Sequence, residues 1–178
     1  MKKQIIILAL LMPTFCFAQI SLHNINSEKY EKKLFNATSS TNISGGTPVD
    51  KQTFQLKNGK NEIGTFIAGK GFNHNDDSIC FVGWENGKDH TLRIIPTIGY
   101  DRWEAEECLN TEAVSKISYH GTDKIAAIYK ASSPNAIAYE SVIFAVKENN
   151  LIIDEALTRK YGSQGVKTVS ELKSIMEK

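Results

Sequence analysis

Short apolar runs separated by turn signals dominate the sequence between Lys51 and Glu155. Apolar and polar residues alternate in several of these runs, as they do in strands with one buried face. The pairs Asn58-Gly59 and Asn86-Gly87 are typical of tight β-hairpin turns. Most connections are too short for parallel crossovers, so neighbouring strands should run antiparallel. The pattern predicts a mainly antiparallel sheet of about six to eight short strands.

Helical patterns lie on either side of the predicted strands. Residues 21–36 mix apolar positions at helical spacing with charged ones and predict a short N-terminal helix. Near the other end, Thr168 and Glu171 have capping-box spacing, and Leu172 and Ile175 lie on one helical face. These residues predict a C-terminal amphipathic helix. The expected fold class is therefore α+β.

The segment 37–50 has no periodicity and is rich in Ser, Thr, Gly and Pro. Such a composition is typical of loops, so we expect a flexible loop between the N-terminal helix and the first strand. No internal repeat is present, and the length suits one domain.

The first 18 residues have the features of a secretory signal peptide. Two lysines precede an apolar run from Ile5 to Met12, and the small residues Cys16 and Ala18 stand at the cleavage positions. The run is shorter than the roughly 20 residues that span a bilayer. We expect cleavage after Ala18, which leaves residues 19–178 as a single globular domain. The short, lysine-led form indicates the periplasm of a Gram-negative bacterium, with full secretion as the alternative.

The charge balance narrows the range of partners. The whole chain has 21 basic and 20 acidic side chains, and cleavage would remove two lysines. The mature protein is then nearly neutral and has no strong basic field to attract nucleic acid or anionic lipid. No later segment is apolar enough to cross a membrane, so we do not expect an integral membrane protein.

The cysteine count predicts a disulfide. Two cysteines, Cys80 and Cys108, follow the expected cleavage site, and an even pair in an oxidising compartment is normally bonded. The alternative is that Cys80 is a free catalytic thiol. Nothing in the sequence indicates how such a thiol would be protected from oxidation.

The stretch from Gly71 to Gly87 contains His74, Asp76, Asp77 and Cys80, and could suggest a catalytic or metal-binding loop. Asn and Asp are, however, the residues that turns favour, and the stretch lacks both the ligand order of a calcium loop and the paired histidines of a zinc site. We interpret it as a turn before a strand, and predict no metal and no cofactor.

Catalytic motifs are likewise missing from the sequence, so no catalytic residue is predicted. Three carboxylates stand close together at Glu104, Glu106 and Glu107. Glycosidases use a carboxylate pair across a sugar cleft, so a small peptidoglycan hydrolase remains an alternative function. The other interpretation of these acids is a solvated helix face.

Aromatic residues near the cysteines indicate a surface for a protein partner. A disulfide would bring the strand of Trp84 beside the segment of Tyr100, Arg102 and Trp103, and Trp, Tyr and Arg are enriched at binding hot spots. Asp76 and Asp77 would add acidic groups for a basic partner. We therefore expect a non-enzymatic periplasmic binding protein, an inhibitor or immunity protein that neutralises a toxin or cell-wall hydrolase. A subunit of an envelope assembly that adds its sheet edge to a partner is a further alternative.

Overall fold

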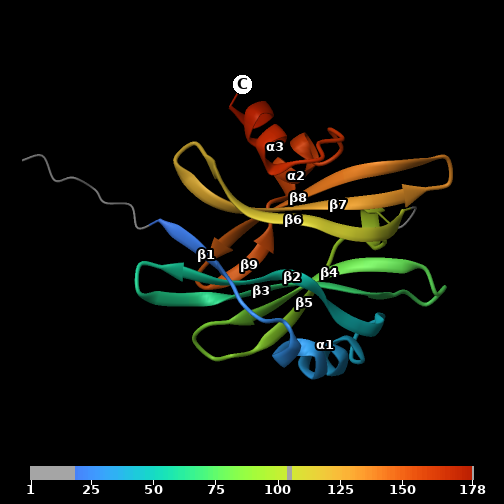
Figure 1. Cartoon of the computed structure of the whole chain (residues 1–178), viewed down its shortest axis with the longest axis horizontal. Coiled ribbons are helices and arrows are strands. Elements are labelled where there is room, and N and C mark those ends of the chain that lie inside the picture. Colours follow the sequence, from blue (N-terminus) through green and yellow to red (C-terminus); the bar gives the residue numbers. More distant parts are fainter. Residues whose placement is uncertain (1–18, 104–105, 178) are drawn as a thin grey trace, which may run out of the picture.

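The computed structural model describes residues 19–103 and 106–177 and shows two antiparallel sheets packed face to face (Figure 1). The predicted signal peptide lies outside these residues. The first sheet has the order β1-β2-β3-β4-β5. Its strands are β1 (Ile20–Asn24), β2 (Ser44–Asn58), β3 (Asn61–Phe72), β4 (Ser78–Asn86) and β5 (Leu92–Pro96).

The second sheet follows in the chain and has the order β6-β7-β8-β9. Its strands are β6 (Glu107–Tyr119), β7 (Thr122–Ser133), β8 (Ala136–Lys147) and β9 (Asn150–Ile153). In both sheets each strand pairs with the strand next to it in sequence. For every pair except β1 and β2, which residues 25–43 connect, this follows from the short turns, because a turn of a few residues can return the chain only to the adjacent position.

The main hydrophobic core lies between the two sheets. Alternate residues of each strand point inward, so that Phe66 and Ala68 of the first sheet face Ile125 and Phe144 of the second. The rings of Phe66 and Phe144 meet edge to face, with centroids 5.6 Å apart. Burial of side chains of this size accounts for most of the favourable free energy of folding.

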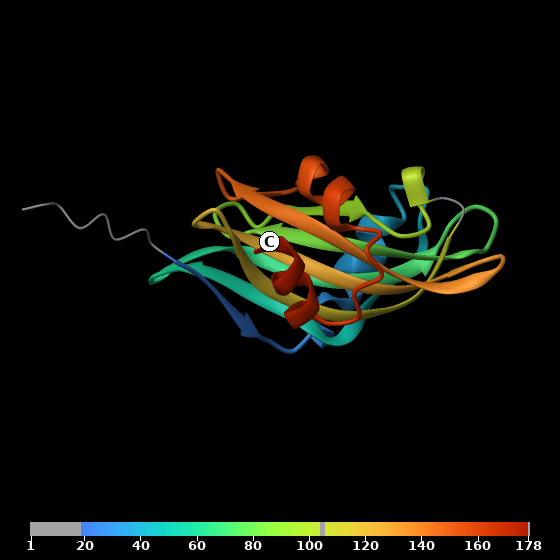
Figure 2. The same ribbon diagram turned by 90° about the horizontal axis from the view of Figure 1, so that it is seen from above.

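Helices cover the outer faces of both sheets, giving four layers. α1 (Glu31–Thr38) follows the short helix η1 (Glu28–Tyr30) and lies on the first sheet. Leu34 of α1 reaches the sheet at Gly83, where a Cβ atom would lie 2.6 Å from a Leu34 methyl group. α2 (Glu155–Tyr161) and α3 (Val169–Met176) cover the second sheet, as Figure 2 shows from above.

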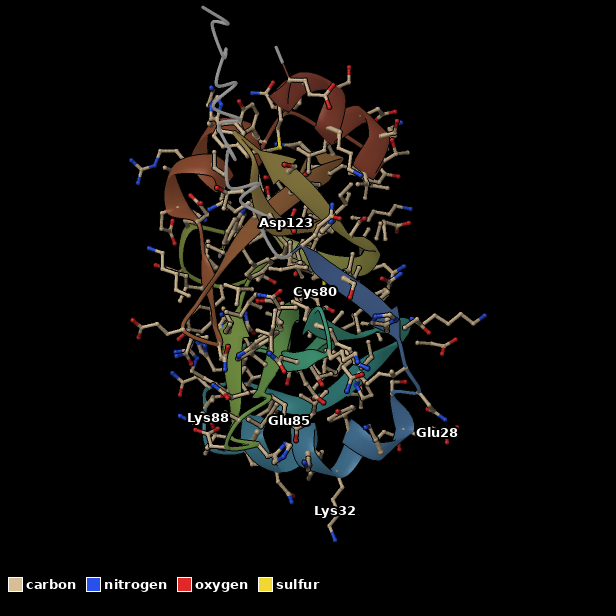
Figure 3. All side chains as sticks on the ribbon, turned by 90° about the vertical axis from the view of Figure 1, so that its left-hand side faces the viewer. Glu28, Lys32, Cys80, Glu85, Lys88 and Asp123 are labelled. Atoms are coloured by element: carbon tan, nitrogen blue, oxygen red, sulfur yellow. A yellow bond between two sulfur atoms is a disulfide. The ribbon has the colours of Figure 1, made fainter. Side chains whose placement is uncertain are left out.

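A polar contact also joins α1 to the first sheet. Glu85 of β4 is buried between the sheet and the helix. It accepts a hydrogen bond of 3.1 Å from the Tyr30 hydroxyl and pairs with Lys33. Figure 3 shows Glu85 on the sheet above α1 and Lys32 on the side of the helix that faces away from it. The contact satisfies a carboxylate that burial would otherwise destabilise.

The expected fold class is correct in its main features, because most of the described chain forms antiparallel sheet. The strand count was underestimated, since the described residues form nine strands. The prediction of a helix over residues 21–36 was wrong in its first part, where β1 pairs with β2 from Ile20↔Asn58 to Asn24↔Phe54. The helical pattern there is overridden because Ile20 and Leu22 pack against the core between the sheets.

The expected loop at residues 37–50 is also corrected. Its first residues complete α1, and residues 44–50 form the start of β2, where Ser44 pairs with Phe72 and Pro48 with Gly69. Hydrogen bonding to β3 outweighs the poor strand propensity of this segment. The strand is irregular there, with register shifts before Thr53 and a positive φ of 58° at Lys51.

The C-terminal amphipathic helix is confirmed as α3. The Thr168 side chain caps it by accepting a hydrogen bond of 3.2 Å from the Glu171 backbone N–H. The sequence analysis missed α2, which is only seven residues long and is capped by Asp154. None of the helices in the described part of the chain has the length and apolarity of a membrane span.

Candidate functional site at the disulfide end

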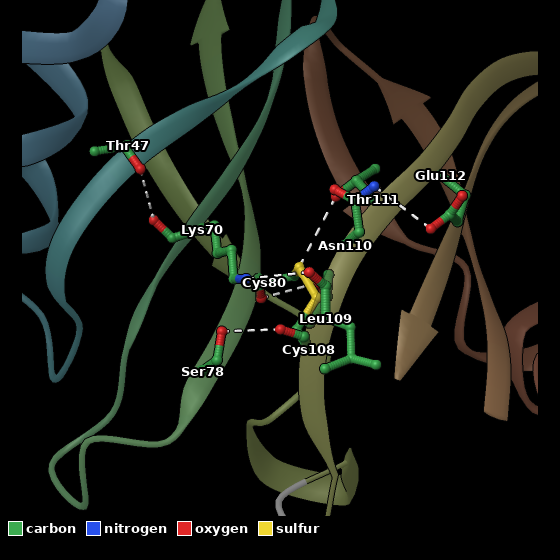
Figure 4. The surroundings of a disulfide bond; sticks show 10 residues. Thr47, Lys70, Ser78, Cys80, Cys108, Leu109, Asn110, Thr111 and Glu112 are labelled. Carbon is green, nitrogen blue, oxygen red and sulfur yellow. Dashed lines mark hydrogen bonds between the residues drawn. A yellow bond between two sulfur atoms is a disulfide. The ribbon is translucent and has the colours of Figure 1, made fainter. Parts of the chain in front are cut away.

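Cys80 of β4 and Cys108 of β6 form a disulfide that joins the two sheets (Figure 4), which confirms the predicted pairing. Their Cα atoms lie 5.5 Å apart and both side chains are fully buried. A nucleophilic Cys80 is therefore excluded in this structure. The bond sits near one end of the sandwich, which we call the disulfide end. It comprises the end of β3 at Phe72 with the following turn at residues 73–77, the segment 97–103, the first residues of β6, and the β7–β8 turn with the first residues of β8.

Side chains of the first sheet form hydrogen bonds with the start of β6 beside the disulfide. Ser78 Oγ donates to the Cys108 carbonyl at 2.8 Å, and Lys70 Nζ donates to the Leu109 carbonyl at 3.1 Å (Figure 4). These bonds satisfy backbone oxygens at the outer edge of β6, which pairs only with β7 among the described strands. The two sheets are therefore joined here by covalent and polar contacts as well as by packing.

The segment 97–103 begins with hydrogen bonds to β4. Thr97 and Ile98 are buried, and Tyr100, Asp101 and Arg102 follow at the surface. Thr97 donates its backbone N–H and its hydroxyl to the Cys80 carbonyl, both at 2.9 Å. Gly99 has φ of 87° and lies so close to Ile79 that a Cβ atom would come within 2.6 Å of it. Only glycine suits both conditions. The chain then forms the helical turn η2 (Asp101–Trp103).

Tyr100 and Asp101 line one side of a hollow of about 290 Å³, and Asn73 and His74 line the other. The hydrogen bonds of Cys80 to Thr97 and Ile98 thus bring the turn at residues 73–77 beside the segment 97–103. Tyr100 is partly exposed at the rim. The hollow combines an aromatic ring with polar groups, which suits recognition of a protein surface.

Arg102 and Trp103 point to the opposite side of η2. The Arg102 guanidinium lies 4.0 Å from the Trp103 ring centroid and forms an ion pair of 2.5 Å with Glu155, the first residue of α2. Trp103 is half-buried and packs against the core between the sheets. Arg102 therefore links η2 to α2, in addition to any role it has at the surface.

Behind Trp103 the structure brings together two carboxylates, Glu106 and Glu140. They line a hollow of about 440 Å³ that also contains Arg102, Arg159 and Ser163. Ser163 Oγ donates a hydrogen bond of 3.0 Å to Glu140, whereas Glu106 Oε2 is buried without a hydrogen-bond partner among the described residues. The sequence indicated Glu106 but gave no signal for Glu140, which lies 34 positions away on β8.

Burial raises the pKa of both carboxyl groups. The negative charge of Glu140 raises the pKa of Glu106 further. For Glu140, the hydrogen bonds from Ser163 and Trp103 and the charge of Arg102 oppose the effect of burial but do not cancel it. Paired carboxyl groups with raised pKa values are found at acid–base catalytic sites, and also in structural clusters. Of the other acids considered, Glu107 is exposed at the start of β6, and Glu104 lies outside the described residues.

The remaining predicted partner-binding residues divide into two groups. Asp76 is exposed and Asp77 is half-buried in the turn at residues 73–77. There the Asn73 side chain accepts the Asp77 backbone N–H at 3.0 Å and donates to the Asp77 carboxylate at 3.2 Å. This is the turn that the sequence indicated. Trp84, by contrast, is a core residue with an exposed fraction of 1 %, and its indole N–H donates to the Asn149 carbonyl at 3.0 Å. Trp84 offers no surface to a partner, because its ring fills space between the sheets.

Exposed apolar side chains gather at the disulfide end. Among the described residues, four of the five large apolar side chains that are exposed lie there, namely Phe72, Tyr100, Leu109 and Ile137, and the fifth is Phe35 on α1. Ile137 and Phe72 are the most open of the four, with exposed fractions of 60 % and 46 %. The sequence could not reveal this gathering, because the four residues belong to different strands and loops.

No group of three or more His, Cys, Asp or Glu side chains in residues 19–103 and 106–177 is arranged to hold a metal ion. No family model, no curated protein and no solved structure matches this chain.

Proposed function

We propose that this chain is a non-enzymatic binding protein of the bacterial envelope, an inhibitor or immunity protein that neutralises a toxin or cell-wall hydrolase. The observation that carries the proposal is the concentration of exposed Phe72, Tyr100, Leu109 and Ile137 at one end of the sandwich. Exposed apolar groups that gather in one region, with polar groups around them, mark interaction sites. The disulfide and its flanking hydrogen bonds would keep this end rigid, which lowers the entropic cost of binding.

The compartment is part of the proposal. A disulfide between buried cysteines suits a protein that matures in an oxidising environment. The N-terminal sequence has the pattern of a secretory signal peptide. Together these features support a periplasmic site of action.

The charges at the disulfide end suggest the kind of partner. Asp101 lines the hollow beside Tyr100 and His74. Asp76 and Asp77 follow His74 in the adjacent turn. An acidic rim around an aromatic anchor would attract a basic surface and increase the rate of association. Cell-wall hydrolases commonly present a basic surface, because they act on an anionic polymer.

The experiment is an inhibition assay. The mature protein is added to the toxin or hydrolase encoded beside its gene, and the release of peptidoglycan fragments or killing of cells is measured. We expect inhibition by the wild type, weaker inhibition by Tyr100→Ala, and no change with Phe35→Ala on α1. Full inhibition by Tyr100→Ala would place the contact surface elsewhere. If the wild type neither inhibits the enzyme nor forms a complex with it, the proposal is contradicted.

A second candidate function is a peptidoglycan hydrolase that uses Glu106 and Glu140. The observation in its favour is the shared hollow, in which both carboxyl groups have a raised pKa and one Glu106 oxygen is buried without a described partner. Against it, Arg102 and Arg159 line the same hollow and can balance the carboxylates as a structural cluster. Release of fragments from peptidoglycan by the protein alone, abolished by Glu106→Gln and by Glu140→Gln in folded variants, would favour the hydrolase.

A further inference from the structure

One edge of β8 lacks a strand partner near the disulfide end. β9 pairs with β8 only from Phe144 to Lys147. Before that point the same edge is covered by other groups, since the Ser141 N–H donates to the Gly162 carbonyl at 2.9 Å and the Ile143 N–H donates to Thr158 Oγ1 at 3.0 Å. In the described part of the chain, no strand pairs with this edge between Ala136 and Glu140. The β7–β8 hairpin reaches the right-hand end in Figures 1 and 2.

The backbone groups of Ile137 and Tyr139 face this open edge. In a strand, successive residues direct their N–H and C=O groups to opposite sides, so residues 137 and 139 share the side used by Ser141 and Ile143. The edge therefore offers donors and acceptors at two positions. Unpaired backbone groups of this kind are a template for an added strand.

The side chains beside the edge define what such a strand should carry. Ile137 is exposed, and Tyr139 next to it on the same face is half-buried. Lys130 lies opposite Tyr139 in the β7–β8 register, and Lys167 Nζ lies 5.5 Å from the Tyr139 ring centroid. Neither lysine forms an ion pair with a described residue. These residues line a hollow of about 470 Å³ together with Glu140, whose carboxylate is bonded to Ser163.

We propose that the edge of β8 from Ala136 to Glu140 binds an extended, acidic segment of a partner protein as an added strand. The inference rests on the proposed binding function and names the mode of recognition. Main-chain hydrogen bonds to Ile137 and Tyr139 hold the segment. An apolar side chain of the segment packs on Ile137, and an acidic side chain two positions along pairs with Lys130 and Lys167. This is strand addition with side-chain selection on one face.

Charge argues against a second copy of the chain as the occupant. Antiparallel pairing of two β8 edges about Ala138 would place Ile137 opposite Tyr139 of the other copy. Lys130 and Lys167 of both copies would then bring four positive charges to one seam, and like charges gathered at an interface disfavour association. An acidic segment relieves this repulsion.

The test uses the mature protein and a synthetic peptide of about nine residues, the length of a typical strand. The peptide has threonine at every second position, with valine and glutamate alternating at the others. Amide chemical shifts are followed by NMR during titration. We expect the amide signals of Ile137 and Tyr139 to shift, and a control peptide with lysine in place of glutamate to bind at least about fivefold more weakly.

Two controls separate strand addition from other binding. A peptide methylated on its backbone nitrogens keeps its side chains but loses its donors, and should not bind. Ile137→Ser should weaken binding at least about fivefold, whereas Phe35→Ser, at an exposed apolar residue on α1, should not. Both substitutions are at exposed sites and their folding is checked by circular dichroism. Peptides that bind equally well whatever their charge, shifts confined to other residues, or dimerisation through β8 would each overturn the proposal.

Failure of this test would not contradict the proposed function. If the acidic peptide does not bind at about 2 mM, a concentration well above the dissociation constants typical of specific binding, strand addition is overturned. Inhibition of a hydrolase that depends on Tyr100 would still support the binding function. If neither peptide binding nor inhibition is observed, both strand addition and the proposed binding function are contradicted.

Discussion

The Cα atoms of Cys80 and Cys108 lie 5.5 Å apart across the core between the sheets, so the disulfide joins two sheets whose strands share no backbone pairing in the described residues. Thr97 and Ser78 bond to the carbonyl oxygens of these two cysteines at 2.9 and 2.8 Å. The disulfide therefore also fixes the segment that carries Tyr100 and Trp103.

We predict that the double variant Cys80→Ala, Cys108→Ala is less stable by about 3.5 kcal/mol, from the entropy of a loop closed over this separation. Urea denaturation followed by tryptophan fluorescence measures the difference. In the wild type, both cysteines should resist alkylation until the protein is reduced, as mass spectrometry can show. A stability change below about 1 kcal/mol would mean that the unfolded chain is already restricted there.

A second prediction concerns the pH dependence of stability at Glu140. Burial raises the pKa of this carboxyl group in the folded state, so the folded protein holds more protons than the unfolded chain over that range. Stability should decrease as the pH rises from about 4.3, the ordinary pKa of glutamate, through the folded value. Glu140→Gln removes the penalty and should be more stable than the wild type at neutral pH.

Thermal unfolding of both proteins between about pH 4 and pH 8 tests this prediction, because the range begins near the ordinary glutamate pKa and extends well above it. The advantage of Glu140→Gln should shrink as the pH falls, and Glu106→Gln should behave in the same way. Glu107→Gln, at an exposed site on β6, is the matched control. A pH-independent difference would show that the glutamine acts through hydrogen bonding rather than charge.

A third prediction concerns the ion pair beneath α1. Lys33→Met leaves the buried Glu85 carboxylate with the Tyr30 hydroxyl but without its cation. Because Lys33 is itself about half exposed, water replaces part of the lost interaction, and we expect a cost of roughly 1–2 kcal/mol. Lys32→Met on the outer side of the same helix should cost little. Equal effects of the two substitutions would contradict the importance of the Glu85 contact.

A fourth prediction separates two roles of Asp154. Its side chain caps α2 by accepting the Leu157 N–H, and it also pairs with Lys124 at 2.8 Å. Asp154→Ala loses both contacts and should cost about 1–2 kcal/mol, whereas Asp154→Asn keeps the cap and should cost less. Burial acts to raise the pKa of Asp154, but the Lys124 and Leu157 contacts lower it overall.

The folded Asp154 pKa is therefore below the unfolded value of about 3.9, so its stabilising effect is present above that pH and is lost as the pH falls through the folded pKa. Urea denaturation at neutral and acidic pH checks the sign. The difference between wild type and Asp154→Asn should disappear in acid. If the wild type stays more stable than Asp154→Asn below the folded pKa, the protonated Asp154 side chain stabilises the helix as well as the carboxylate does.

A fifth prediction addresses the binding surface. Tyr100→Ala should weaken binding of the partner by roughly thirtyfold, the cost of truncating an aromatic anchor, and Asp76→Asn by only a few fold with a salt-dependent association rate. Trp103→Ala is the less suitable probe, since Trp103 also packs against the core. Surface plasmon resonance at two salt concentrations measures both effects. If both variants are folded and bind with unchanged affinity, the interface does not include the hollow of Tyr100 and His74.

Local patterns in the sequence predicted most of the strands and the hairpin turns that join them. The Asn58-Gly59 pair predicted the β2–β3 hairpin, in which Asn58 pairs with Asn61 and Gly59 has φ of 60°. Thr168 and Glu171 likewise predicted the start of α3. Such features depend on residues a few positions apart, whose backbone preferences and side-chain caps act in any context. The disulfide was predictable for a different reason, since two cysteines allow one intramolecular pairing.

Only the tertiary structure decided which side chains meet over long sequence distances. Residues 20–24 and 44–50 became strands because β2 and β3 offered hydrogen bonds at their edges, which no local pattern records. Trp84 was assigned to the core because its position in β4 faces the second sheet. Glu140 came beside Glu106, and the open edge of β8 arose because β9 ends after four residues. Burial and charge at these places depend on packing between distant segments, so their pKa values, exposure and partners follow from the fold alone.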